Sequence, residues 1–162
     1  MSLLVRKVDK YPLWSKDTAV PFLEQNDSPA DVLSDLRTKE NRISVYVLAQ
    51  DKSNLERVVR AIAAGKDRIE HTAYIVFDSQ IVSDAGIEIV EVPGETGDTE
   101  VNSLHRDLVL TGRKLVELAV GILRDGEQVQ RILREEMVQL VEQGIAAGEL
   151  PEVYRKKIPT KK

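Results

Sequence analysis

Residues 43–65, with the sequence ISVYVLAQDKSNLERVVRAIAAG, contain the clearest strand-to-helix unit of the chain. Residues 43–49 are apolar on both alternating faces and rich in β-branched side chains, which is typical of a strand covered by a layer on each side. Ser53 and Glu56 then match a capping box, apolar residues follow at helical spacing, and Gly65 stops the run. The unit predicts a layered α/β fold.

Three further segments have the pattern of strands. Residues 3–8 form a short apolar strand, residues 72–77 repeat the doubly buried pattern, and residues 87–92 alternate more openly, as nearer an edge. Helices are expected from Ser28 to about Thr38 and, as a single turn, over 79–85. Together these elements predict an α/β fold with a mixed four-stranded sheet and flanking helices. Because the connection 79–87 is short for a parallel crossover, the third and fourth strands should be antiparallel or separated in the sheet.

The C-terminal half predicts helices alone. Strand signals vanish after Asp98, and two helices joined around Gly126 are expected to form a long C-terminal helical hairpin over 98–147. Residues 9–27 show no clean period but hold apolar and aromatic side chains, so we expect an irregular segment that covers part of the core. Residues 1–150 are expected to form a single α/β domain, and the basic residues 151–162 a loose tail.

The second helix of this hairpin, about 30 Å long at 1.5 Å per residue, carries one apolar stripe. A core of this size is not expected to cover the whole stripe, so it should meet either the remaining core or a partner. The function we favour from the sequence is therefore a non-enzymatic protein-interaction or self-association module, with a homodimer as the first expectation. The stripe consists of Val129, Ile132, Leu133, Met137, Leu140, Val141 and Ile145.

Carboxylates at the predicted strand ends suggest a different function. Asp51 follows the second strand, Asp78 ends the third, and Glu95 and Asp98 lie in a glycine-containing turn after the fourth. If they converge, Asp51, Asp78 and Asp98 could bind Mg²⁺ through oxygen ligands, as in a small metal-dependent hydrolase or nucleotide-handling enzyme. Acidic residues also cap helices in such turns, which is the competing interpretation.

His105 is a candidate general base, because it follows Asp98 closely in the first turns of a predicted helix. The chain has no cysteine, no Gly-x-Ser-x-Gly elbow and no His-Glu-x-x-His pair, so no partner nucleophile or zinc site accompanies it. A structural role for this histidine is the alternative. The sequence therefore leaves enzymatic activity open, favours a protein without catalysis, and indicates no cofactor.

Composition excludes several classes of protein. The absence of cysteine removes disulfides and thiolate metal sites and fits a reducing compartment, so the cytoplasm is the expected location. A net charge of −4 argues against broad binding to nucleic-acid phosphates. No stretch approaches the roughly 18 consecutive apolar residues of a membrane-spanning helix, so no membrane partner is expected.

Residues 141–150, VEQGIAAGEL, resemble the closing helix and turn in the ligand-binding domains of tetracycline-repressor-type regulators. The likeness covers these ten residues, and no helix-turn-helix accompanies it. It carries no function over to this chain.

Overall fold

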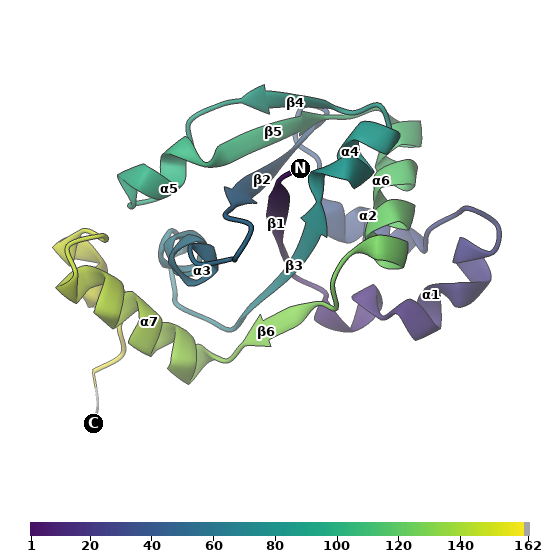
Figure 1. The fold of residues 1–162 in the computed structure, drawn as a ribbon. Coiled ribbons are helices and arrows are strands. Elements are labelled where there is room, and N and C mark those ends of the chain that lie inside the picture. The colour runs from purple at the N-terminus through teal and green to yellow at the C-terminus, as the bar shows by residue number, and fades with distance from the viewer. Residues whose placement is uncertain (161–162) are drawn as a thin grey trace.

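The computed structural model describes residues 1–160, in which one six-stranded sheet lies between two layers of helices (Figure 1). The strand order is β4-β5-β2-β1-β3-β6, and every neighbouring pair is antiparallel. The strands are β1 (Leu3–Val8), β2 (Arg42–Leu48), β3 (Thr72–Asp78), β4 (Glu88–Glu91), β5 (His105–Val109) and β6 (Gln130–Ile132).

The α/β class is confirmed, but the mixed four-stranded sheet is wrong in both strand number and pairing. The four predicted strands are β1 to β4, to which the fold adds β5 and β6. β3 and β4 run in the same direction, because four antiparallel steps link them, but three other strands lie between them. The short connection α4 (Ser79–Asp84) therefore joins strands that are separated in the sheet, which is one of the two expected outcomes.

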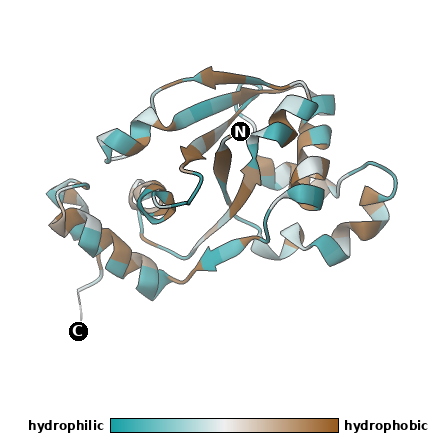
Figure 2. Ribbon diagram, in the orientation of Figure 1, coloured by the Kyte–Doolittle hydropathy of each residue, from teal (hydrophilic) through white to brown (hydrophobic). Residues whose placement is uncertain are grey.

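Four helices cover the first face of the sheet: α4, α1 (Lys16–Leu23), α2 (Ala30–Leu36) and α6 (Gly112–Asp125). The alternation of the strands directs Leu4, Ile43, Val45 and Leu108 into this layer, where all four are buried. Figure 2 shows hydrophobic segments in α6 and in the strands that it covers. The four helices therefore cover this face of the sheet with an apolar core.

The second face carries α3 (Leu55–Ala64), α5 (Thr99–Ser103), α7 (Arg134–Ala146) and the short 3-10 helix η2 (Glu152–Lys157). α3 contacts β1 and β3, and its Val58 and Val59 are buried with Val5 of β1. α7 packs on α3 from outside, as Figure 1 shows. The part of this face over β2 and β5 is less covered, since Arg42 and Ser44 are exposed there.

The predicted C-terminal hairpin is wrong. Residues 99–109 form α5 and β5, so the first long helix, α6, begins at Gly112, where the Thr111 side chain accepts a hydrogen bond from the Lys114 amide. β6 then forms the edge strand beside β3, and α7 begins at Arg134. α6 and α7 lie on opposite faces of the sheet, because each buries its apolar side chains in a different core cluster. Among residues 1–160, no helix has the length and apolar character needed to cross a membrane.

Two segments are more regular than the sequence predicts. Residues 9–27, expected to be irregular, contain the 3-10 helix η1 (Tyr11–Trp14) and α1, and Trp14 of η1 is buried in the core. The tail, expected to be loose, contains η2, because Tyr154 and Ile158 pack on the apolar cluster around α3. Lys157 Nζ also donates to the carbonyl of Ala64, which ends α3, at 2.7 Å. The last two residues, 161–162, lie outside the described part of the chain.

Candidate functional site

A cleft of about 620 Å³ lies on the second face of the sheet, beside α3. Its floor is formed by β2 and β5, and its walls are the C-terminal end of α3, the turn before β2 and the loop that follows β4. Cavities of this size are typical of sites for small ligands. The residues that line it are Lys39, Glu40, Arg42, Ser44, Tyr46, Ile62, Gly65, Lys66, Val92, Pro93, Gly94, Glu95, Thr96, His105 and Asp107.

The register of the sheet decides which side chains share the floor. In the β2–β5 ladder Tyr46 is opposite His105, and Ser44 is opposite Asp107. Because residues i and i+2 of a strand point to the same face, these four side chains and that of Arg42 project together. The sequence indicates that these side chains share one face only when residues 105–109 are treated as a strand. A helix over the same residues would direct positions 105 and 107 to different sides.

His105 is the most enclosed polar side chain of the cleft, with 9% of its surface exposed. Its Nδ1 lies 2.8 Å from the carbonyl oxygen of Val92, and its ring meets the ring of Tyr46 edge-on, with centroids 5.1 Å apart. When Nδ1–H donates to that carbonyl, the lone pair of the neutral ring is on Nε2. Nε2 lies 3.7 Å from Asp107 Oδ1, so an imidazolium ring would face an acceptor at each nitrogen. The ring is therefore held at Nδ1 and directs Nε2 toward Asp107.

The neighbours of His105 complete the floor. Asp107 is also 3.4 Å from a guanidinium nitrogen of Arg42, so that its carboxylate lies between a guanidinium and an imidazole. Burial raises the pKa of Tyr46, and the negative charge of Glu95 raises it further, against the opposing effect of Arg6. Tyr46 therefore keeps its proton at neutral pH and can donate a hydrogen bond.

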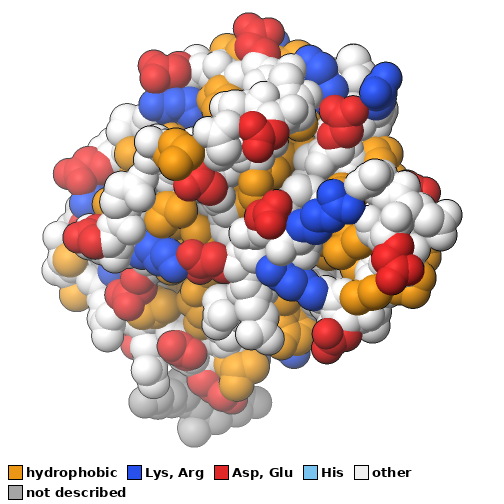
Figure 3. Space-filling model, turned by 45° about the vertical axis from the view of Figure 1, so that its right-hand side comes forward, with side chains coloured by type: hydrophobic (Ala, Val, Ile, Leu, Met, Phe, Trp, Pro, Cys, Tyr) orange, Lys and Arg blue, Asp and Glu red, His pale blue; other side chains and the backbone are white. Residues whose placement is uncertain are grey.

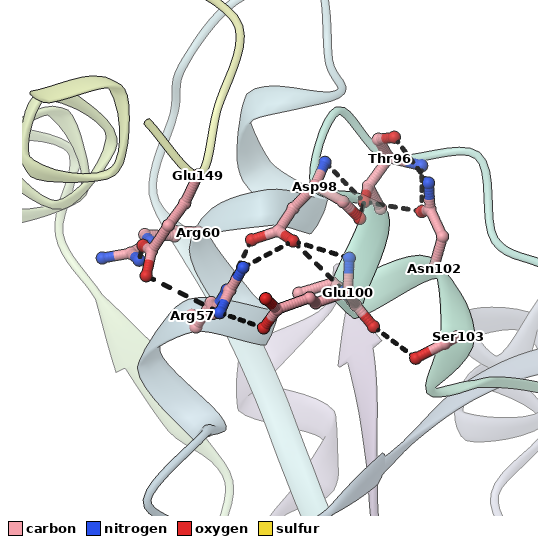
Figure 4. Close-up of polar contacts among 9 residues, drawn as sticks. Arg57, Arg60, Thr96, Asp98, Glu100, Asn102, Ser103 and Glu149 are labelled. Atoms are coloured by element: carbon pink, nitrogen blue, oxygen red, sulfur yellow. Dashed lines mark hydrogen bonds and ion pairs between the residues drawn. The ribbon is translucent and has the colours of Figure 1, made fainter. Parts of the chain in front are cut away.

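The loop wall of the cleft is held by Asn102 of α5 (Figure 4). The Asn102 Oδ1 atom accepts hydrogen bonds from the amide and the hydroxyl of Thr96, both at 2.7 Å, and its Nδ2 donates to the Thr96 carbonyl at 2.9 Å. The amide of Gly94 donates to the Asn102 carbonyl, and a Cβ at Gly94 would lie 3.1 Å from the Cβ of His105. The loop thus approaches His105 closely and is fixed by a closed set of hydrogen bonds.

Asp98 anchors the same loop and does not face His105. It is 1% exposed, it caps α5 by accepting from the amides of Glu100 and Val101, and it makes two hydrogen bonds with Arg57, at 2.7 and 3.0 Å. Burial by itself would raise the pKa of Asp98, but the bonds from Arg57 and the two amides lower it overall. Arg57 also pairs with Glu100 and with Glu149, which Figure 4 shows beside Arg60. Asp98 therefore has a structural role, and the carboxylate beside His105 is Asp107.

The remaining strand-end carboxylates do not meet. Asp51 accepts from the amide of Ser53 at 3.0 Å, Asp78 caps α4 by accepting from Gln80, and only Glu95 lines the cleft. The ends of β3 and β4 are four strand spacings apart, about 19 Å. In the described part of the chain, no three His, Asp or Glu residues form a group that could hold a metal ion. Of the five sequence candidates, the structure brings only Glu95 and His105 into one cleft.

The residues of the predicted interaction stripe differ in burial and lie on both faces of the sheet. Met137, Leu140, Val141 and Ile145 are buried against α3, and Val129 is buried on the opposite face of the sheet. Ile132 is partly buried, and Leu133 is the one member that is largely exposed, at 55%. Most of the stripe therefore meets the core of its own chain.

Charges of both signs are mixed over the molecular face in Figure 3, and hydrophobic side chains are scattered among them. A basic patch of the kind that binds nucleic acid is not seen on this face. Comparisons with protein-family models, with curated proteins and with solved structures found no match to this chain.

Proposed function

We propose that this protein binds a small polar molecule in the cleft over β2 and β5, and that His105 exchanges a proton with it. The enclosure and orientation of the His105 ring support this proposal most. The ring is held by a backbone carbonyl on one side and by Tyr46 on another, while Nε2 lies toward Asp107 on the floor. An oriented histidine in a concave site of ligand size is a usual element of acid–base chemistry.

The other floor residues suit recognition of a polar molecule. Tyr46 and Ser44 offer hydroxyl groups, Asp107 offers acceptors, and Arg42 offers donors. The hydrogen bonds between Thr96 and Asn102 hold the loop wall in place, so that a ligand would not have to order it. The proposed activity is therefore binding, with proton transfer as the chemistry that the site can supply.

A nuclear magnetic resonance screen would test this function. The protein is mixed with amino acids, organic acids, nucleosides and sugar phosphates, and the ring signals of its two histidines are followed. We expect a bound compound to shift the His105 signals and those of loop 92–96, whereas His71, which is exposed and outside the cleft, stays unchanged.

The two histidines also supply matched variants. We expect His105→Gln to weaken binding about tenfold or more, in line with the loss of one hydrogen bond to a charged group. His71→Gln should bind as the wild type does. Binding that maps to another surface, or that survives His105→Gln unchanged, would contradict the proposal.

Self-association through the C-terminal helices stays a second prediction. It is favoured by Leu133, which is exposed at the start of α7 next to the short edge strand β6. Light scattering at tens of micromolar protein tests it. A dimer that Leu133→Ser converts to a monomer would support the prediction, and a wild-type monomer would count against it.

A further inference from the structure

The α3 wall of the cleft carries a positive charge that its neighbours do not neutralise. Lys66 follows the last turn of α3, is half-buried and lines the cleft. Within residues 1–160, no carboxylate lies at ion-pair distance from its ammonium group, and the nearby Asp9 is bound by Lys7. A bound anion could therefore form an ion pair with Lys66.

Lys7, whose own ammonium group is paired with Asp9, lies beside Lys66. It lies on the same face of β1 as Val5, and its ammonium group is close enough to that of Lys66 to act on it. Loss of hydration and the contact with Lys7 lower the pKa of Lys66 from 10.5 to about 8, although Asp9 and Glu70 act in the opposite direction. A bound anion would favour the charged form of Lys66 again.

The loop wall carries the opposite charge. Glu95 lies in the loop held by Asn102, and within residues 1–160 no cation lies at ion-pair distance from it. The negative charge of Glu95 also acts on the floor of the cleft, because it contributes to the raised pKa of Tyr46.

Between the two walls, Arg42 and Asp107 compensate one another at 3.4 Å. The turn before β2 contributes one charge of each sign, Lys39 and Glu40. The cleft is thus positive at the α3 wall, negative at the loop wall, and nearly neutral on its floor and at the turn before β2.

We infer that the ligand of this cleft is a small zwitterion, whose carboxylate or phosphate group binds Lys66 and whose ammonium group binds Glu95. A neutral molecule would leave both charges without partners, and a simple anion bound in the same cleft would be repelled by the carboxylate of Glu95. This inference rests on the proposed function, because it names the class of molecule that the same cleft takes.

Calorimetric titration with free amino acids and with phosphoethanolamine tests the inference, and the two probes distinguish a carboxylate from a phosphate. Each compound that binds is compared with derivatives that lack one charge: the N-acetyl form without the ammonium group, and the amino-acid amide or ethanolamine without the anion. We expect each derivative to bind about tenfold or more weakly than its parent, as expected for the loss of a hydrogen bond between charged groups.

Variants of Lys66 and Glu95 test which residue binds which charged group of the ligand. In Lys66→Gln we expect the preference for the anionic parent to disappear, and in Glu95→Gln the preference for the free amine. Lys156→Gln and Glu24→Gln remove exposed charges that do not line the cleft, and they should leave both preferences intact. A purely structural role of Lys66 or Glu95 would change stability without changing these preferences.

Proton uptake gives an independent readout. At pH about 8, where about half of the Lys66 side chains are protonated, titrations in buffers with different ionisation enthalpies should show that binding takes up a fraction of a proton, at most about one half, and this uptake should be absent in Lys66→Gln. The inference is overturned if none of the zwitterions binds, if derivatives lacking one charge bind equally well, or if both wall variants keep the wild-type preferences. A neutral molecule that binds the cleft and shifts His105 would overturn it while leaving the proposed function intact.

Discussion

Asp98 shows how much of the site depends on one carboxylate. It caps α5 and holds Arg57 from α3, so that it ties the loop wall of the cleft to the helix that forms the opposite wall. Helix capping by Asp98 is one of the two interpretations that the sequence offers, because acidic residues often cap helices after a turn. The partner Arg57 lies 41 positions earlier in the chain, and no local pattern connects the two residues.

The replacement Asp98→Asn removes the charge but keeps a side chain that can cap a helix. We expect a loss of about 1–3 kcal/mol at pH 7, as for a hydrogen bond to a charged group. The folded-state pKa of Asp98 is lowered, so its contribution is present above the ordinary value and is lost as pH falls through the lowered one. The difference from wild type should therefore shrink below pH about 4.

Urea denaturation at pH 7 and pH 3 measures this difference. Asp67→Asn, at an exposed position, is the matched control and should be close to neutral at both values. An unfolding free-energy difference for Asp98→Asn that is equal at pH 7 and pH 3 would show that the ion pair with Arg57 does not stabilise the fold.

Gly97 lies against the C-terminal segment. A Cβ at this position would be 2.8 Å from the Cζ atom of Tyr154, so an alanine displaces the aromatic ring or the loop. We expect Gly97→Ala to destabilise the protein by about 1–3 kcal/mol, as overpacking usually does. Gly112→Ala is the control, because a Cβ there would meet open space. In a double-mutant cycle with Tyr154→Leu, additive effects would rule out this contact.

At the level of helices and strands, the main error of the sequence interpretation concerns β5. Leu104, Leu108 and Leu115 fit a helical stripe, so the sequence pattern predicts a single helix over residues 98–123. The strand is hard to recognise because the polar residues His105 and Asp107 occupy its cleft face, and Leu108 is its one fully buried apolar residue. Thr111, which caps α6, was the local signal for the helix start.

The packing of α7 on α3 gives a prediction about the apolar stripe. Leu140 of α7 is 8% exposed and packs against α3, whereas Leu133 in the same segment is 55% exposed. We expect Leu140→Asp to unfold the protein or to lower its stability by several kcal/mol, because it buries a charge without a partner. Leu133→Asp should change stability by less than about 0.5 kcal/mol. Thermal melting compares them, and equal melting temperatures would mean that α7 is not packed as described.

Over the whole molecule, the two chain ends have different roles. The N-terminal strand β1 lies inside the sheet between β2 and β3, and the C-terminal segment reaches both walls of the cleft. Tyr154 lies beside Gly97 of the loop wall, and Lys157 donates to the carbonyls of Ala64 and Lys66 on the α3 wall, both at 2.7 Å. The cleft is therefore braced by a segment distant from it in sequence.

Removal of residues 151–162 tests this bracing. We expect a lower melting temperature and faster hydrogen exchange in residues 92–98 and at the end of α3, because those segments lose packed partners. Exchange in α6, on the other face of the sheet, should change little. Val153→Ser is the control, since this side chain is 55% exposed. Unchanged exchange in both walls after truncation would contradict the bracing role.

The sequence by itself determined the α/β class, the first four strands and the approximate positions of α2 and α3, because these depend on the apolar periodicity of short segments. It also identified Glu95 and His105 as candidate residues. Only the tertiary structure decided that β5 and β6 join the sheet, that α6 and α7 lie on opposite faces, and that His105 faces Asp107 and not Asp98. The physical reason is that strand pairing and ion pairs join residues far apart in the chain, and local patterns contain no information about which of them meet.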